Sequence, residues 1–266
     1  MLSPVSYLFY FLGPVLLAVW WRWRSGAEWS FFFIGIPLFL LSQVGVVLVQ
    51  GLMAAIAGVA GGQEYAKTAA LIGAGIGPGL CEESCRVLGF YWLSRRSKPA
   101  TWNRGFMYAI GHSGMETVLV GLGILAALAA AEYMPDKLPE SVVQSIDEMR
   151  QTPTWKATLL AAHRLFGGLL IHATFTSLVV LFMQHRQWRW LLAAMGLHAV
   201  NNWVAISLQS QLAHLGFLAI FTLCLVAVYG ALLWWTWRLT HHQPAPTANA
   251  GTTADTTSTP EDSHTP

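Results

Sequence analysis

The sequence predicts an all-α fold: a polytopic membrane helix bundle of about seven transmembrane helices, with the N-terminus outside and the C-terminus in the cytoplasm. The first observation is the composition. Of the 266 residues, 55% are hydrophobic and only 11% are charged, whereas soluble domains contain about 25% charged residues. The second observation is that apolar runs of about 17 residues or more recur along the chain, which is the length that a bilayer-spanning helix needs.

The predicted helices follow these apolar runs in order. The expected spans are residues 5–21, 31–59, 66–93, 105–131, 157–184, 189–208 and 213–237. They form one membrane domain over residues 1–242. The connector 132–156 has apolar residues at helical spacing, which predicts a short amphipathic helix lying on the outer surface. The tail 243–266 is rich in Pro, Thr, Ala and Ser and has no aromatic residue, so it is expected to be disordered.

The positions of the basic residues predict the orientation, because cytoplasmic loops carry the excess of Lys and Arg. Basic residues follow the first span, link the third to the fourth and the fifth to the sixth, and follow the seventh. They are Arg22, Arg24, Arg95, Arg96, Lys98, Arg104, Arg186, Arg189 and Arg238. In the loops on the other side of the membrane, Lys and Arg are absent or are mixed with Glu and Asp. The net charge of +2 is small, so nucleic acid is not an expected partner.

Ionisable residues inside the predicted spans indicate a candidate site, since charged groups at bilayer depth are unfavourable and usually face the interior of a bundle. Four spans carry such residues together with an asparagine. The set is Glu82, Glu83, Arg86, His112, Glu116, His172, His198 and Asn202. At about 1.5 Å per residue, each span places a polar group about 14 to 20 Å from its cytoplasmic end, namely Glu83, Glu116, His172 and the stretch from His198 to Asn202. These side chains are therefore expected to meet at one level.

The spacing within each span supports this expectation, because residues three or four apart share a helix face. His112 and Glu116 are four residues apart, as are His198 and Asn202. Each pair is expected to direct two polar groups to one point. Pro78, which lies between two glycines, is predicted to break or kink the third span and to free a backbone carbonyl near the site.

Purely structural roles are the alternative. Glu82 and Glu83 are both within reach of Arg86, so either could form a structural ion pair. A single intramembrane histidine is often a hydrogen-bonded packing residue. His163 and Arg164 are about 32 Å from the cytoplasmic end and are expected to be interfacial or snorkelling residues.

Glutamates, histidines and an asparagine at one depth are the groups that hydrolysis by an activated water requires. A carboxylate can take a proton from water, imidazoles can bind a divalent metal, and His with Asn can donate to an oxyanion. Zinc suits these ligand types. Ser84 and Ser113 are not in a nucleophile-elbow motif, so a serine mechanism is not expected.

Four segments resemble the YhfC family of bacterial intramembrane metalloproteases. They are the Cys-Glu-Glu-Ser-Cys-Arg run ending at Arg86, the Gly-His-Ser-Gly-Met-Glu run ending at Glu116, His172, and the His-Ala-Val-Asn-Asn run ending at Asn202. Ser42 and Gln43 in the second span are also similar. More distantly, the pattern resembles the CAAX-processing, bacteriocin-processing and PrsW membrane proteases. The resemblance implies a multi-pass protein of the bacterial cytoplasmic (inner) membrane, whose partners are the lipid bilayer and a membrane-associated peptide or protein substrate.

The same resemblance implies roles for the site residues. The implied catalytic residues are Glu82, Glu83, Arg86 and Asn202. The implied metal ligands, with Zn²⁺ as the expected ion, are Glu116, His172, His198 and His112. Glu82 or Glu83 would polarise a water that the metal binds, Arg86 would hold the pair, and Asn202 would stabilise an oxyanion. His112 is either a ligand or a partner of Glu116.

The sequence also leaves other functions open. A non-catalytic membrane scaffold of the APH-1 type belongs to the same superfamily but has lost the glutamate pair, which Glu82 and Glu83 retain here. A proton-coupled transporter could also use intramembrane Glu and His, although such proteins usually contain an internal repeat and none is evident. A haem site could use His172 and His198, but haem gives no reason for the glutamates. A glutamate-dependent protease without metal is also possible.

Overall fold

The computed structural model describes residues 4–208 and 214–241, and within these ranges every regular element is a helix. The tail predicted to be disordered lies outside the described residues. In chain order the elements are α1 (Pro4–Tyr7), the π-helical turn η1 (Leu8–Leu12), α2 (Gly13–Ser25), α3 (Trp29–Gly61), α4 (Gln63–Ser94), α5 (Trp102–Tyr133), the 3₁₀ turn η2 (Pro135–Lys137), α6 (Glu140–Gln151), α7 (Thr154–His185), α8 (Trp188–Leu208) and α9 (Leu215–His241).

The helices confirm the predicted all-α, polytopic class. Six segments of the described chain are long and apolar enough to cross a membrane, namely Pro4–Ser25, α3, α5, α7, α8 and α9. The remaining predicted span, the third at residues 66–93, corresponds to α4, which has 32 residues but is not among the six. Glu82, Glu83 and Arg86 interrupt its apolar sequence. Pro78 lies inside α4 without ending it, so the helix is not broken there, and the alternative of a kink stays a prediction.

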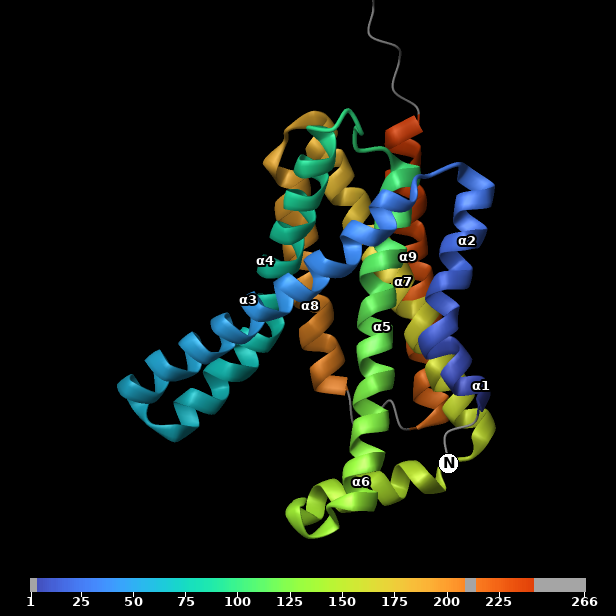
Figure 1. Ribbon diagram of the computed structural model, residues 1–266. Coiled ribbons are helices and arrows are strands. Elements are labelled where there is room, and N and C mark those ends of the chain that lie inside the picture. The colour runs from blue at the N-terminus through green and yellow to red at the C-terminus, as the bar shows by residue number, and fades with distance from the viewer. Residues whose placement is uncertain (1–3, 209–213, 242–266) are drawn as a thin grey trace, which may run out of the picture.

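The bundle is built around α7. Of its most apolar stretch, 72% is buried, against 33% or less in the other five candidate spans. α7 packs against α5, α8 and α9, while α4 lies between α3 and α8. The far halves of α3 and α4 form a hairpin that leans away from the other helices (Figure 1). The polar stretches of α4 and α7 are thus brought together in the part of the molecule where all these helices meet.

Glycines let the helices approach closely beside the polar residues. A Cβ atom added at Gly111 of α5 would lie only 2.1 Å from the backbone oxygen of Phe32 in α3. A Cβ added at Gly79 of α4 would lie 2.5 Å from the backbone oxygen of Met195 in α8. Because Gly111 precedes His112 directly, the α3–α5 contact sets the position of a site residue.

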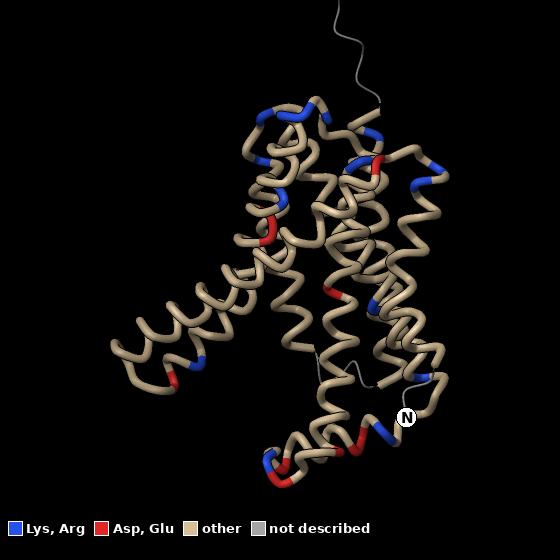
Figure 2. Tube along the Cα trace, viewed as in Figure 1, with Lys and Arg blue, Asp and Glu red and all other residues tan. Residues whose placement is uncertain are grey.

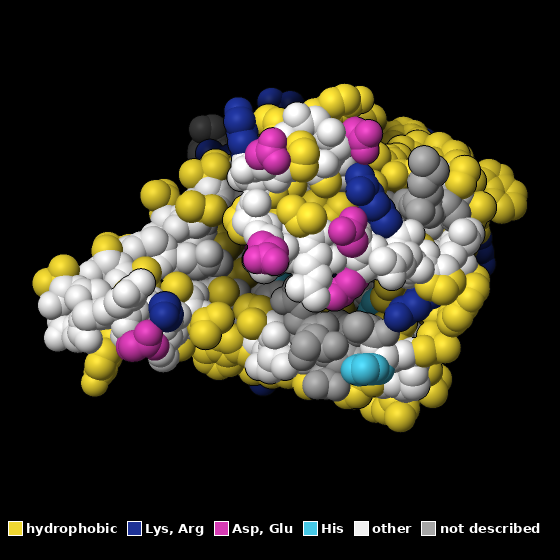
Figure 3. All heavy atoms as spheres, turned by 90° about the horizontal axis from the view of Figure 1, so that it is seen from below, with side chains coloured by type: hydrophobic (Ala, Val, Ile, Leu, Met, Phe, Trp, Pro, Cys, Tyr) yellow, Lys and Arg dark blue, Asp and Glu magenta, His cyan; other side chains and the backbone are white. Residues whose placement is uncertain are grey.

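Most of the basic residues gather at one end of the bundle, where α2 ends, α4 connects to α5, α7 connects to α8, and α9 ends (Figure 2). The opposite end holds η2 and α6, the short helix predicted for the connector, with Ile146 as the buried residue of α6. Viewed from that side, acidic side chains are prominent on the surface (Figure 3). This separation agrees with the predicted orientation, in which the basic end is cytoplasmic.

One ion pair at the basic end joins Glu28, the residue that precedes α3, to Arg104 of α5. The Arg104 guanidinium donates to Glu28, with Nε 2.8 Å from Oε2 and Nη2 2.5 Å from Oε1. This hydrogen bond holds the pKa of Glu28 below its ordinary value. A lowered pKa in the folded state means that the pair stabilises the fold at neutral pH and that this contribution is lost as the pH falls below about 4.

We therefore expect Glu28→Gln to lower the free energy of unfolding at pH 7, by less than about 1 kcal/mol because the pair is partly exposed. The difference between variant and wild type should shrink toward pH 3. Thermal unfolding in detergent at both pH values measures it, and an equal difference at the two pH values would contradict the assignment.

Candidate metal centre and active site

The two adjacent glutamates of α4 are both buried but have different partners. Both carboxylate oxygens of Glu83 lie 2.6 Å from Nη1 of Arg86. Glu82 instead accepts from Nε2 of Gln43 on α3, at 3.1 Å. The expectation that both glutamates reach Arg86 is therefore corrected, because Arg86 pairs with Glu83 while Glu82 turns toward α3. Both spacings to Arg86 share a helix face, but consecutive residues point about 100° apart, so the two carboxylates meet different neighbours.

Glu82 is held at its second oxygen by a histidine. Nε2 of His112, a fully buried residue of α5, lies 2.9 Å from Oε2 of Glu82. Gln43 and His112 together occupy both oxygens of this carboxylate. Nδ1 of His112 is buried and has no hydrogen-bond partner among the described residues.

His198 of α8 bridges the two glutamates. Its Nδ1 lies 2.8 Å from Oε1 of Glu83, and its Nε2 lies 3.7 Å from Oε2 of Glu82. Glu83 is paired with Arg86 and accepts hydrogen bonds, so Nδ1 of His198 is the nitrogen that carries the proton. In the neutral imidazole, Nε2 then has a free lone pair directed to the side of Glu82.

His172 of α7 completes the cluster. Its Nδ1 lies 3.3 Å from Nη2 of Arg86, and its Nε2 lies 2.8 Å from Oε2 of Glu116 on α5. Its ring centroid is 4.9 Å from that of His112 and 5.5 Å from that of His198. The other oxygen of Glu116 forms an ion pair with Arg164, at 2.5 Å.

Three of these residues fit a metal ion. Glu82, His172 and His198 are all buried, and each offers one ligand atom such that the three atoms lie within 4.8 Å of one another. In a tetrahedral zinc site with bonds of about 2.0–2.2 Å, two ligand atoms are about 3.5 Å apart. A small inward movement of the side chains would reach that geometry. Two histidines and a glutamate are also a known ligand set of catalytic zinc.

The structure brings most of the sequence-predicted site residues together, but the group that could bind a metal ion differs from the implied ligand set. His172 and His198 belong to the three-residue group, and so does Glu82, for which the resemblance implies a role on water. Glu116 and His112 each lie one hydrogen bond outside the group. The assignment of these two as ligands stays a prediction.

Asn202 lies one turn after His198 on α8. It is half-buried, and its Nδ2 has no hydrogen-bond partner within the described part of the chain. The neighbouring Asn201 accepts from the Tyr229 hydroxyl of α9, at 3.1 Å. An unpaired amide donor on the same helix as a candidate ligand is compatible with the predicted role in oxyanion stabilisation.

Two residues of the network have no role that the sequence assigns. Gln43 is part of the resemblance, but its contact with Glu82 depends on the packing of α3 against α4. Arg164 is expected at the membrane surface from its depth, whereas the structure pairs it with Glu116. The sequence signal that points to Arg164 is its spacing: it lies about two helical turns before the intramembrane residue His172.

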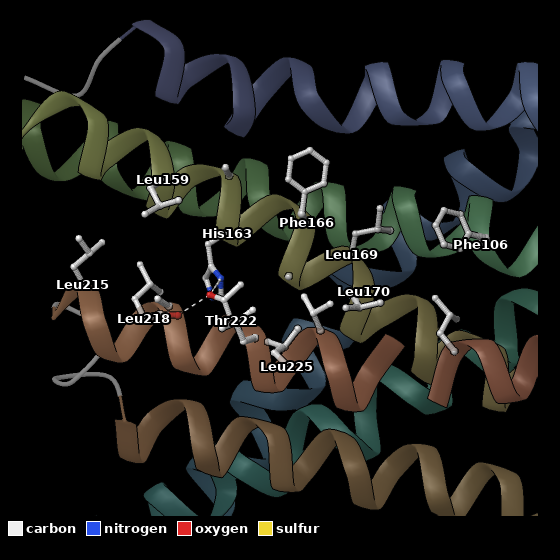
Figure 4. A pocket seen from close by; sticks show the side chains of 16 residues that line it. Phe106, Leu159, His163, Phe166, Leu169, Leu170, Leu215, Leu218, Thr222 and Leu225 are labelled. Atoms are coloured by element: carbon white, nitrogen blue, oxygen red, sulfur yellow. Dashed lines mark hydrogen bonds between the residues drawn. The ribbon is translucent and has the colours of Figure 1, made fainter. Parts of the chain in front are cut away.

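An apolar cavity of about 720 Å³ lies apart from this cluster, between α7 and α9 (Figure 4). His163 and Thr222 are polar side chains in its lining, and they lie 3.0 Å apart in a hydrogen bond. The residues of the glutamate and histidine cluster do not line it. His163 therefore packs against Thr222 in the wall of this cavity, and its expected interfacial depth stays a prediction.

One comparison with known proteins gives a match. The family model described as YhfC intramembrane metalloprotease matches residues 9–223. That region contains every residue of the cluster described above. Neither the curated proteins nor the solved structures contain a significant match. The chain belongs to the YhfC intramembrane metalloprotease family.

Proposed function

We propose that this protein is a metal-dependent intramembrane protease that hydrolyses a peptide bond of a membrane-associated substrate, with Zn²⁺ held by Glu82, His172 and His198. The convergence of these three buried ligand groups from α4, α7 and α8 carries the proposal. When bound, zinc supplies Lewis-acid polarisation of a carbonyl and favours ionisation of water near neutral pH.

The surrounding hydrogen bonds support this assignment, because ligands of catalytic metals are usually oriented by a second residue. Gln43 and His112 hold the two oxygens of Glu82. Glu83 holds Nδ1 of His198. The third ligand, His172, is held at Nε2 by Glu116. Each candidate ligand thus has its own positioning contact, which a cluster formed only by chance packing would not require.

Glu82 is central to the proposal. Glu83 has both oxygens bound to Arg86, so Glu82 is the α4 carboxylate that faces the other two ligand groups. In a metal-dependent mechanism Glu82 is a ligand. In a glutamate-dependent mechanism without metal, Glu82 is the residue placed to take a proton from water. Asn202 would donate to the oxygen that becomes negative in the transition state.

Cleavage in proteoliposomes tests the proposal. We expect purified protein, reconstituted with a mixture of synthetic single-span peptides, to generate new peptide termini that mass spectrometry detects. Glu82→Gln removes the charge at nearly constant volume and should reduce cleavage at least about 100-fold, as for loss of a group that acts in the transition state. A chelator should abolish cleavage and added zinc should restore it.

Lys67→Gln is the matched control, because Lys67 forms an exposed ion pair with Glu64 far along α4 from the cluster. This variant should cleave like wild type. Cleavage that survives in Glu82→Gln would exclude the proposed site, and cleavage that survives the chelator but not Glu82→Gln would indicate the glutamate-dependent mechanism without metal.

A further inference from the structure

Arg164 is connected to the candidate metal centre through one carboxylate. It lies on α7, eight residues before His172 on the same helix. Glu116 of α5 joins the two, because its Oε1 lies 2.5 Å from Nη2 of Arg164 and its Oε2 lies 2.8 Å from Nε2 of His172. No segment of the family resemblance includes Arg164.

The donors around His172 determine which of its nitrogens carries the proton. Arginine can only donate hydrogen bonds. Nη2 of Arg86 faces Nδ1 of His172 at 3.3 Å, so Nδ1 is the acceptor in this network. The proton is then on Nε2, which donates to Glu116. The contacts assign one tautomer to a histidine that could otherwise adopt either.

The charge of Glu116 also depends on Arg164. A carboxylate within a membrane span is strongly unfavourable unless an opposite charge accompanies it. Arg164 supplies that charge at ion-pair distance. The side chains of Arg164 and Glu116 are 35% and 28% exposed, whereas that of His172 is only 6% exposed. The pair therefore lies at the more accessible side of the buried histidine.

We propose that Arg164 is a positioning residue of the site: its ion pair with Glu116 fixes His172 through Nε2–H and leaves Nδ1 as the metal-binding nitrogen. The metal part of this inference rests on the proposed function. Nδ1 has the longer contact, 3.3 Å against 2.8 Å at Nε2, and a metal ion would replace it. Glu116 acts in this arrangement as a carboxylate behind a histidine ligand and is not itself a ligand.

Zinc affinity provides the first test. The dissociation constant of purified metal-depleted protein is measured by competition with a chelating dye. We expect Arg164→Gln and Glu116→Gln each to bind one zinc ion per chain but about 10- to 100-fold more weakly than wild type. The double variant should be no weaker than the weaker single variant, since both changes remove one coupled contact. Arg164→Lys should recover part of the affinity.

The matched control is Lys67→Gln, which removes one positive charge from an ion pair outside the site and should leave the affinity unchanged. Unchanged affinity in Arg164→Gln would overturn the proposal. Loss of zinc stoichiometry in Glu116→Gln, with wild-type affinity in Arg164→Gln, would make Glu116 a ligand and would also overturn it.

The tautomer of His172 is the second test and does not depend on metal. Nitrogen-15 NMR of histidine-labelled, metal-free protein reports which ring nitrogen is protonated, and His172→Asn identifies the signal. We expect Nε2–H in both wild type and Arg164→Gln, because Arg86 still donates to Nδ1. In Arg164→Gln the proton signal of Nε2–H should move upfield, because Glu116 without its ion pair holds this hydrogen bond less firmly. If wild type binds no zinc, the proposed metal site fails, and the strength of this hydrogen bond alone decides the role of Arg164. An Nε2–H signal at the same position in both proteins would refute that role.

Discussion

Replacing Glu82 with glutamine or His198 with alanine should reduce the zinc content of purified protein from about one ion per chain to background. Each change removes one of three ligand groups contributed by different helices. A tetrahedral zinc site cannot retain the ion with two protein ligands at competitive affinity. Elemental mass spectrometry of detergent-purified protein measures the result directly.

Two variants separate loss of a ligand from loss of the fold. Glu82→Gln preserves the volume of the side chain, whereas His198→Ala also removes a ring that stacks on Phe175, with centroids 4.6 Å apart. His163→Ala is the control, because His163 is an intramembrane histidine outside the cluster. It should keep its zinc. Helical circular dichroism should be the same in all three variants.

The possible outcomes have different meanings. Zinc retained in His163→Ala and lost from the other two would support the proposed ligand set. Zinc retained in both Glu82→Gln and His198→Ala would show that the ion binds elsewhere. Wild-type protein without metal would reject the metal site and leave the glutamate-dependent mechanism, which the cleavage assay addresses.

Gly111→Ala should destabilise the bundle by forcing α3 and α5 apart. The new methyl group would lie 2.1 Å from the backbone oxygen of Phe32, and a backbone atom cannot rotate away as a side chain can. Overpacking of this kind typically costs about 1–3 kcal/mol. His112 follows Gly111 directly, so its hydrogen bond to Glu82 should weaken as well.

Thermal unfolding in detergent measures this prediction. The matched control is Gly123→Ala on the same helix, where an added Cβ meets no atom within 4 Å. That change should be neutral or stabilising by up to about 1 kcal/mol, because alanine has the higher helix propensity. Equal unfolding temperatures for the two variants would contradict the close approach of α3 and α5.

The class of the fold and most of the cluster could be predicted because they depend on local sequence. A bilayer-spanning helix satisfies its own backbone hydrogen bonds, so apolar runs of sufficient length reveal it without knowledge of its neighbours. Hydropathy alone does not identify α4 as a membrane span. It is as long as α5 and α7, but its polar residues lower its mean hydropathy, and it is not among the six candidate spans. Those same polar residues are the evidence for the site.

The pairing of side chains could not be predicted, because it depends on contacts between helices. Glu82 and Glu83 are neighbours in sequence but have different partners. Glu82 binds Gln43 and His112, whereas Glu83 binds Arg86, and only the packing of α3, α5 and α8 around α4 decides this. Depth along a helix likewise did not indicate that Arg164 pairs with Glu116. A long side chain can extend well away from its own Cα, so helical rise alone does not locate its charged group.

The sequence by itself therefore determined that this is a helical membrane protein with glutamate, histidine and arginine at a common depth, since composition and periodicity are properties of single segments. The tertiary structure decided that Glu82, His172 and His198 form the candidate metal group and that Glu116 is joined to Arg164. The physical reason is that ligand geometry and ion pairing act between atoms a few ångströms apart, and helix packing alone sets those separations.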